Sequence, residues 1–329
     1  MLDQAFQQDV LSTDVLTDKN SVNIYDDITQ TIGNTPLVRL SRLAKQYNCK
    51  ADIVAKVEFF NPAGSIKDRP AFAMLQALMA DKSFNKDTQI IEASSGNNGV
   101  ACAWLCAMYH IPLTIVIPEH MSIERQQLIK HYGANVITTP KTLGTKGAID
   151  RAAALVEATP GAVSLNQFGN GANPTAHIDS TAHEIYRDTQ GELDAVIAGV
   201  GTGGTITGLA KGLENRVDNL SVIAVEPASC PVLTEGRSGV HNIQGLSSGH
   251  VPDVLATDLL DQIICIEDED AVEMARELAR VEGLAVGISS GATMKAAIQL
   301  AQKPEWEGKR IVVILADGAE RYFSTALFA

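Results

Sequence analysis

The sequence predicts an α/β fold with parallel sheets. Short apolar runs typical of buried strands alternate with segments whose apolar residues recur at helical spacing. This alternation is typical of βαβ units, in which helices cover the faces of a parallel sheet. The chain has 329 residues, enough for about two domains.

The individual elements follow from length and periodicity. Strands are predicted for runs that are short, apolar and rich in β-branched residues: 52–60, 88–93, 112–118, 134–139, 193–200, 220–227 and 310–316. Helices are predicted between them at 67–81, 97–110, 122–133, 147–158, 205–216 and 268–283. Residues 1–28 are polar and aperiodic, so they are expected to form an N-terminal extension.

Composition narrows the functional class. The net charge of −13 argues against a nucleic-acid partner, because such proteins usually present a basic face. No apolar run has the length of a membrane span, and the first twenty residues do not resemble a secretion signal. Five cysteines without a C-x-x-C pair argue against a disulfide framework, and the spacing of His177 and His183 does not predict a metal site. A cytoplasmic enzyme acting on small molecules is expected.

Ligands of parallel sheets bind where strands lead into helices, and three such loops are rich in small polar residues. The first spans residues 61–70 and contains Lys67 near the start of a helix. A helix N-terminus lowers the pKa of an amine, which suits a lysine that forms a Schiff base. The alternative is a solvated lysine paired with Asp68 or Glu58.

The second loop, residues 92–99, reads Glu-Ala-Ser-Ser-Gly-Asn-Asn-Gly. Its successive backbone N–H groups, two hydroxyls and two amides can hold an anion such as a carboxylate. The alternative is a well-capped helix, with Ser95 or Asn97 as the cap.

The third loop, residues 199–205, has the composition of a phosphate-binding loop. It also permits a rival interpretation, because its glycines satisfy G-x-G-x-x-G and Glu226 follows as in a dinucleotide-binding domain. That interpretation leaves the other two loops unexplained, whereas a compact phosphorylated cofactor with a reactive aldehyde accounts for all three.

Together these segments resemble the fold type II pyridoxal-phosphate (PLP) enzymes, and within them the cysteine synthase (O-acetylserine sulfhydrylase) and cystathionine β-synthase family. The resemblance begins at residue 32. Its marks are GSIKDR (64–69), EASSGNNG (92–99), NQF (166–168), GVGTGGTITG (199–208), HNIQGL (241–246), GISSGA (287–292) and ERYFSTALF (320–328). It implies two three-layer α/β domains with parallel sheets, similar to the tryptophan synthase β-subunit: a smaller mobile domain at 61–170 and a larger PLP-binding domain at 29–60 plus 171–329.

The resemblance also implies residue roles. Lys67 would bind PLP covalently and later move the α-proton of the substrate. Asn97 would bond the 3′ oxygen of the cofactor. The cofactor phosphate would be held by Gly201, Thr202, Gly203, Gly204 and Thr205, and the substrate carboxylate by Ser94, Ser95, Asn98, Gln167 and Gly245.

The implied reaction is β-replacement: O-acetyl-L-serine loses acetate, an aminoacrylate remains on PLP, and sulfide adds to give L-cysteine. Alternatives within the family are another donor or nucleophile (O-phosphoserine, thiosulfate, homocysteine or an amine) and a lyase or racemase acting on serine or threonine. The resemblance further implies a homodimer, and a binding role toward the C-terminal tail of serine acetyltransferase is a further hypothesis.

Several positions depart from the commonest cysteine synthase pattern. Asn98 replaces a threonine, Ser247 and His250 replace small or aromatic residues, and Asp317 lies where most members have Pro-Ser. Asp317 could keep the pyridine nitrogen protonated, or it could face solvent or cap a turn. His250 is interpreted as a polar surface residue rather than a catalytic one. These departures leave the donor and nucleophile open.

Overall fold

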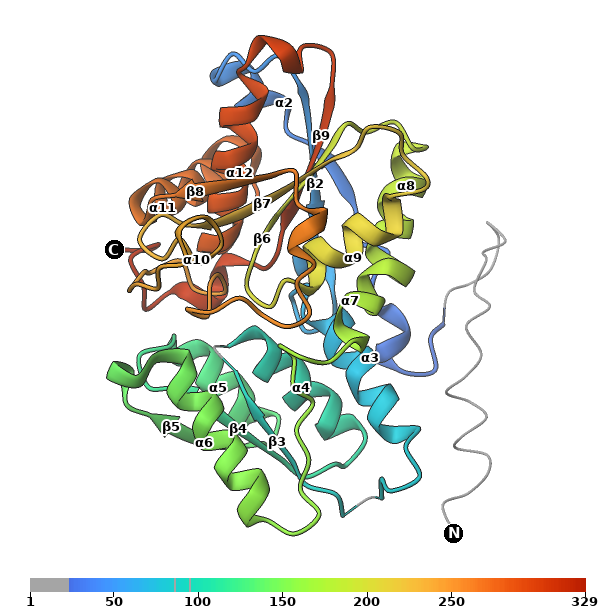
Figure 1. The fold of residues 1–329 in the computed structure, drawn as a ribbon, viewed down its shortest axis with the longest axis vertical. Helices are drawn as coiled ribbons and strands as arrows, with labels where there is room; N and C mark the ends of the chain where they lie inside the picture. Colours follow the sequence, from blue (N-terminus) through green and yellow to red (C-terminus); the bar gives the residue numbers. More distant parts are fainter. Residues whose placement is uncertain (1–23, 86, 95) are drawn as a thin grey trace.

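The computed structural model describes residues 24–85, 87–94 and 96–329. The predicted N-terminal extension therefore lies outside the described residues up to position 23, and Ser95 of the second loop is also outside them. The described chain forms two halves that are stacked along the long axis of the molecule (Figure 1). The larger half consists of a six-stranded sheet with its covering helices, and the smaller half of a three-stranded sheet with its covering helices.

The larger sheet has six strands in the order β1-β2-β9-β6-β7-β8. Their bounds are β1 Leu37–Arg39, β2 Asp52–Val57, β6 Ala195–Gly199, β7 Ser221–Pro227, β8 Gln262–Ile266 and β9 Arg310–Leu315. All neighbouring pairs are parallel except β1 with β2. The antiparallel edge strand β1 and the outer strand β8 were not predicted. β1 is too short to show periodicity, and β8 is only partly buried along most of its length.

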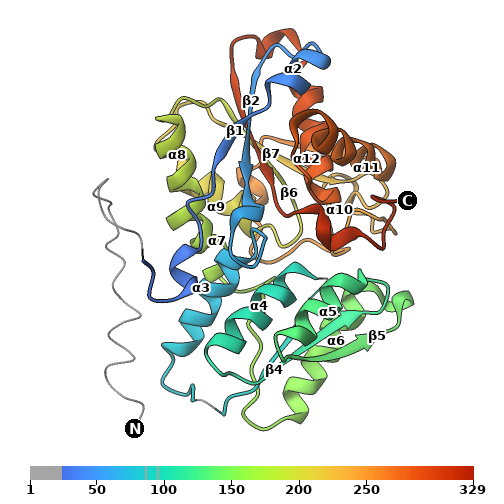
Figure 2. The same cartoon turned by 180° about the vertical axis from the view of Figure 1, so that it is seen from behind.

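Helices cover both faces of this sheet because successive side chains of a strand point to opposite faces. Ile197 and Val313 pack on the side of α11 (Asp268–Glu277) and α12 (Ile288–Ala301). Val196 and Val312 pack on the other side, with α8 (His183–Thr189) and α9 (Gly204–Leu213). Figures 1 and 2 show these helices on the two faces.

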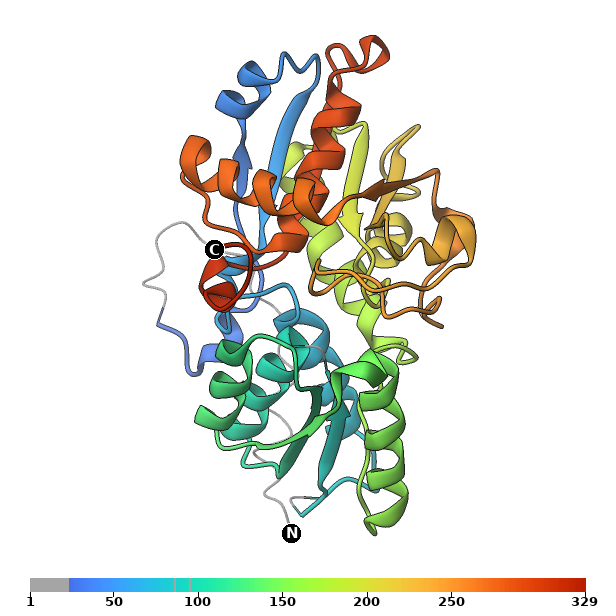
Figure 3. The same ribbon diagram turned by 90° about the vertical axis from the view of Figure 1, so that its left-hand side faces the viewer.

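The smaller sheet has three parallel strands, β3 (Ile90–Ala93), β4 (Leu113–Pro118) and β5 (Asn135–Thr139). One face, with Ile115, packs against α4 (Asn97–Met108) and α5 (Ile123–His131). The other face, with Val116, packs against α6 (Gly144–Ala158). Figure 3 shows the strands between these two layers. All three strands fall within the predicted smaller domain, residues 61–170.

The predicted helices are present with boundaries shifted by a few residues. The first predicted helix corresponds to α3 (Asp68–Met79). The last corresponds to α11, which is α-helical up to Glu277 and continues as a π-helical turn at Leu278–Glu282. Several helices were not predicted from the sequence: α2 (Ser41–Gln46), α7 (Ala172–Ala176), the π-helical turn His177–Ala182 that follows it, α8, the short α10 (Val232–Glu235) and α12. The helix α12 is buried on nearly all sides, so it lacks the polar face that marks an amphipathic helix. No helix in the described part of the chain is both long and apolar enough to span a bilayer.

Candidate active site

Lys67 is the residue that directly precedes α3, in the loop that connects β2 to this helix. Burial lowers the pKa of its amine to about 8, and the nearby carboxylate of Asp317 limits this decrease. The proposed partners are engaged elsewhere: Asp68 accepts the backbone N–H of Ala63, and Glu58 binds Arg69. Lys67 is half-buried and pairs with neither of them, so the interpretation of Lys67 as paired with Asp68 or Glu58 is wrong.

Asp317 follows β9 and is completely buried, which excludes the alternative that it faces solvent. Its backbone is held beside the Lys67 loop, because Ser65 and Asp317 form an antiparallel bridge. One carboxylate oxygen, Oδ2, accepts from Asn97 and from the Tyr322 hydroxyl at 2.7 Å. The other, Oδ1, is buried and lacks a hydrogen-bond partner among the described residues. A buried acceptor of this kind suits the protonated nitrogen of a pyridine ring.

Asn97, the first residue of α4, connects this helix to the segment that follows β9. Its Nδ2 donates to Asp317 Oδ2 at 2.6 Å, and its Oδ1 accepts from Arg125 and Arg321. Residues predicted from separate motifs, Asn97 and Asp317, are thus brought into direct contact 220 positions apart.

The polar side chains of the second loop, residues 92–99, have two different roles. The Ser94 hydroxyl accepts the N–H groups of Gly96 and Gly99, at 3.0 and 2.8 Å, so it caps α4. Asn98 is buried, and neither its Nδ2 nor its Oδ1 has a hydrogen-bond partner among the described residues. Unpaired buried amide atoms are costly unless a ligand completes them. Asn98 therefore fits a substrate-binding role, while Ser94 has a structural role whatever it binds.

Gln167 is anchored beside this loop. Its Nε2 donates to the Ala93 carbonyl at 3.0 Å, and its backbone N–H donates to Glu92 at 3.3 Å. Glu92 also accepts from Ser164, so the buried carboxylate fixes the 164–167 segment beside β3. One N–H of the Gln167 amide is left to donate to a ligand.

The third loop connects β6 to α9 and is shaped for close approach of an anion. Gly203 has a φ of +80° and contributes no side chain to cap the helix. A Cβ on Gly201 would collide with the carbonyl oxygen of Gly245, so only glycine allows the 245 segment to lie against this loop. The hydroxyls of Thr202 and Thr205 complete a set of donors at a helix N-terminus, which fits a phosphate group.

The rival dinucleotide-binding interpretation fails on Glu226. Its carboxylate accepts the N–H groups of Leu233 and Thr234, at 2.8 and 3.0 Å, and the Thr234 hydroxyl at 2.7 Å. A carboxylate already used to start α10 is not free to bind a ribose.

Several polar residues around the site were not found by sequence reasoning. Asn173 Nδ2 donates to Thr202 Oγ1 and to the Gln167 carbonyl, at 3.0 and 2.8 Å, and thereby connects the 199–205 loop to the segment that contains Gln167. His177, buried and with its pKa well below the ordinary value because of that burial, contacts Thr205 Oγ1 at 3.3 Å. Arg125, Arg321 and Tyr322 surround Asn97 and Asp317. Arg321 and Tyr322 belong to the ERYFSTALF segment, but the segment indicated no role for either, and Arg125 lies outside all the recognised motifs.

Two of the departures from the family pattern lie at the edge of the site. Ser247 has a φ of +33°, and its hydroxyl lies 3.2 Å from Cys230 Sγ. His250 is exposed, and its ring lies 5.6 Å from that of Phe168, next to Gln167. This position agrees with its interpretation as a polar surface residue.

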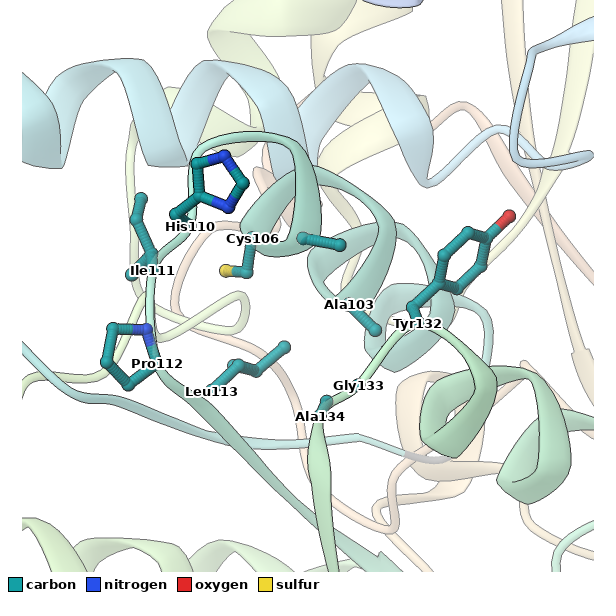
Figure 4. Close-up of a pocket in the computed structure, with 10 residues that line it drawn as sticks. Ala103, Cys106, His110, Ile111, Pro112, Leu113, Tyr132, Gly133 and Ala134 are labelled. Carbon is teal, nitrogen blue, oxygen red and sulfur yellow. The ribbon is translucent and has the colours of Figure 1, made fainter.

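A separate pocket of about 360 Å³ lies in the smaller half, between the end of α4, the start of β4 and the end of α5 (Figure 4). Its lining includes Cys106, His110 and Tyr132. None of the predicted site residues lines it. Burial raises the pKa of the Cys106 thiol to about 12, so this cysteine is not a reactive thiolate. In the described residues, no cluster of His, Cys, Asp and Glu could hold a metal ion.

Lys67, the buried carboxylate of Asp317 and the glycine-rich loop 199–205 are the features expected of a PLP-dependent enzyme. The family model described as "Pyridoxal-phosphate dependent enzyme" matches residues 28–317, and the chain belongs to this family. Cysteine synthase B of Campylobacter jejuni is 42% identical over 308 residues, which cover 94% of this chain and 100% of the relative.

Solved structures of other enzymes also resemble this chain over most of its length. A cysteine synthase from Entamoeba histolytica matches with a TM-score of 0.89 and 39% identity, over 95% of this chain and 93% of that one. An O-ureido-L-serine synthase matches with a TM-score of 0.88 and 37% identity, over 93% of this chain and 96% of that one. The resemblance, the α/β fold and the dependence on PLP are thereby confirmed.

Proposed function

We propose that this chain forms L-cysteine from O-acetyl-L-serine and sulfide. The observation that carries the proposal is the grouping of Lys67, Asn97 and Asp317 beside a glycine-rich phosphate loop. The similarity to cysteine synthases over nearly the whole chain supports this choice of reaction.

Lys67, Asn97 and Asp317 would hold the PLP ring system, and residues 201–205 its phosphate. When bound, PLP withdraws electrons from the substrate carbons. The Lys67 amine takes the proton from the substrate Cα, and a pKa of about 8 leaves part of it neutral near physiological pH. Asp317 Oδ1 would accept a hydrogen bond from the protonated ring nitrogen, and the carboxylate charge would keep that nitrogen protonated, which strengthens the electron withdrawal.

Asn98, Gln167 and the backbone of the 94–99 loop would bind the substrate carboxylate, with Ser95 and Gly245 completing the set. We also propose that residues 61–170 move as one smaller domain and close over the substrate. Closure excludes water, which would otherwise hydrolyse reactive intermediates.

The direct test adds O-acetyl-L-serine to the purified protein without a nucleophile and follows the visible absorption of bound PLP. We expect the band to change on addition of the donor and to return when sulfide is added, with release of L-cysteine. A Lys67→Ala variant should lack this response. A protein that binds PLP but ignores O-acetyl-L-serine would exclude this donor.

A second candidate is β-replacement with another donor or nucleophile, such as O-phosphoserine, thiosulfate, homocysteine or an amine. It is favoured by the unpaired amide of Asn98, which presents a donor nitrogen and a separate acceptor oxygen where a threonine with one hydroxyl is usual. A protein with this fold is an O-ureido-L-serine synthase, so another protein of this fold forms a related product. Comparing kcat/KM across these donors and nucleophiles decides between the two candidates, and Asn98→Thr should shift the preference toward O-acetyl-L-serine.

Assembly and location are separate proposals that rest on the family. We propose a cytoplasmic homodimer, which sedimentation velocity and cell fractionation test. Binding of a serine acetyltransferase tail would be detected as competition between a C-terminal tail peptide and O-acetyl-L-serine.

A further inference from the structure

Arg125 is a buried arginine that the proposed reaction does not yet use. It is the third residue of α5, in the smaller half, and only 1% exposed. Its side chain lies across Gly96, where φ is +151° and an added Cβ would collide with the Arg125 Cδ and Nε atoms. The shape of the substrate-binding loop at Gly96 is therefore matched to the presence of Arg125.

The guanidinium of Arg125 contacts both halves of the molecule. Within the smaller half, Nε donates to Asn97 Oδ1 at 3.1 Å. In the larger half, Nη2 lies 3.4 Å from Asp317 Oδ2, Nη1 donates to Gln244 Oε1, and Cζ lies 4.4 Å from the centre of the Tyr322 ring. A planar guanidinium presents five donors in a fixed fork and can stack on an aromatic face, an arrangement that a compact ammonium with three donors does not reproduce.

These contacts determine which way the Asn97 amide points. Its Oδ1 accepts from two guanidinium groups, because Arg321 Nη1 also donates to it at 3.0 Å. The amide Nδ2 is consequently left to donate to Asp317 Oδ2, the oxygen that Arg125 also contacts. The oxygen cannot exchange places with the nitrogen without placing amide N–H groups against two cations.

We propose that Arg125 is a positioning residue for the cofactor site: when the two halves are closed, it fixes the Asn97 amide and the Asp317 carboxylate for cofactor binding. This inference rests on the proposed function. It predicts that part of the cofactor affinity depends on a side chain supplied by the smaller half. Opening of the two halves would withdraw the cation from Asp317 and release the Asn97 amide.

A neighbouring residue provides a matched control. The Glu124 carboxylate accepts the N–H and the hydroxyl of Ser324 in the C-terminal segment, at 2.8 and 2.9 Å. This contact joins the same two halves without touching Asn97 or Asp317. Glu124→Gln therefore removes one exposed contact between the halves and leaves the closed arrangement in place, whereas Arg125→Gln disturbs the cofactor partners. Arg151→Gln, on the exposed side of α6, controls for loss of a positive charge.

The experiment measures the dissociation constant of PLP from the loaded protein by absorbance after dilution. It compares wild type, the three variants, Asp317→Asn, and the double variant Arg125→Gln/Asp317→Asn. We expect Arg125→Gln to weaken binding about tenfold, the effect of losing a charge-assisted hydrogen bond. In the Asp317→Asn background its effect should fall to less than about twofold, because the two residues act through one another. Glu124→Gln and Arg151→Gln should stay within about twofold of wild type.

Circular dichroism checks that each variant folds. If Arg125→Gln does not fold, Arg125→Lys carries the test: it keeps the charge but cannot bond Asn97 and Asp317 together, so binding should weaken by about threefold. Unchanged or tighter binding in the Arg125 variants would overturn the inference, and so would an equal loss with and without Asp317. A wild-type protein that takes up no PLP would instead overturn the proposed function, and this inference with it.

Discussion

Lys67 and Asp317 are adjacent at the junction of the two halves, and the Asp317 charge partly offsets the effect of burial on the Lys67 amine. Lys67 lies in the loop between β2 and α3, directly before the helix. Asp317 lies just after β9, the strand that pairs with β2. Parallel pairing of these two strands brings their carboxyl ends together. The pairing of β2 with β9 therefore places the nucleophilic amine beside the carboxylate.

The first prediction concerns the pH dependence of cofactor uptake. Only the neutral amine attacks an aldehyde, and the Lys67 pKa is lowered from 10.5 to about 8. The rate at which cofactor-free protein binds PLP should therefore rise with pH up to about 8 and then level off. In Asp317→Asn the loss of the carboxylate charge should lower the pKa further and move the plateau to lower pH. Stopped-flow absorbance measures both, and a rate that keeps rising toward pH 10.5 would contradict the assignment.

The second prediction concerns the buried ion pairs of Arg69, two residues after Lys67. Arg69 binds Glu58 and Glu184, and all three side chains are at most 7% exposed. Arg69→Met leaves two buried carboxylates without this partner and should lower the free energy of unfolding by about 3–5 kcal/mol. Arg237→Met, which breaks an exposed pair with Glu235, should change it by less than about 1 kcal/mol. Urea denaturation monitored by circular dichroism compares the two, and equal effects would show that the buried network contributes little.

The third prediction concerns acid stability. Although burial opposes it, hydrogen bonding and charge from Arg69, with a contribution from Lys56, lower the pKa of Glu184 from 4.5 to about 2. A carboxyl group whose pKa is lower in the folded state stabilises the fold above its unfolded pKa, and this contribution is lost as pH falls from about 4.5 to about 2. Glu184→Gln should be less stable than wild type at neutral pH and lose less stability over that acidic range. Unfolding free energies measured across the range would refute the prediction if the two curves were parallel.

The fourth prediction concerns the phosphate loop. Gly201→Ala places a Cβ against the Gly245 carbonyl, so the loop must shift and PLP affinity should fall at least about tenfold. Gly171→Ala is the matched control, because an added Cβ there meets no atom within 4 Å. The Gly171 variant should bind PLP like wild type. Fluorescence titration of cofactor-free protein measures both affinities, and normal binding by Gly201→Ala would remove this loop from the cofactor site.

Much of the fold was predictable because burial leaves a local signature. Strands such as β4 and β9 are apolar on both faces, and α3 and α11 each have one apolar stripe. The antiparallel edge strand β1 and the buried helix α12 lack these signatures. Their structure depends on neighbours that are distant in the sequence, so local periodicity did not reveal them.

Sequence reasoning could propose site residues where the implied chemistry is carried by contiguous loops, as for Lys67 and the glycines of residues 201–204. It could not do so where single side chains meet from different elements. Arg125, Arg321 and Tyr322 converge on Asn97 and Asp317 only after α5 and the C-terminal segment pack together. Asp317 itself was recognised as a departure, but its burial could be established only from the fold.

The central claim, that Lys67 carries PLP, is tested most directly by reducing the loaded protein with borohydride and mapping its peptides by mass spectrometry. Reduction converts a lysine–PLP linkage into a stable phosphopyridoxyl group. We predict this modification on the peptide that contains Lys67, and its disappearance in Lys67→Ala. A phosphopyridoxyl group on another lysine, or none in wild-type protein saturated with PLP, would contradict the assignment.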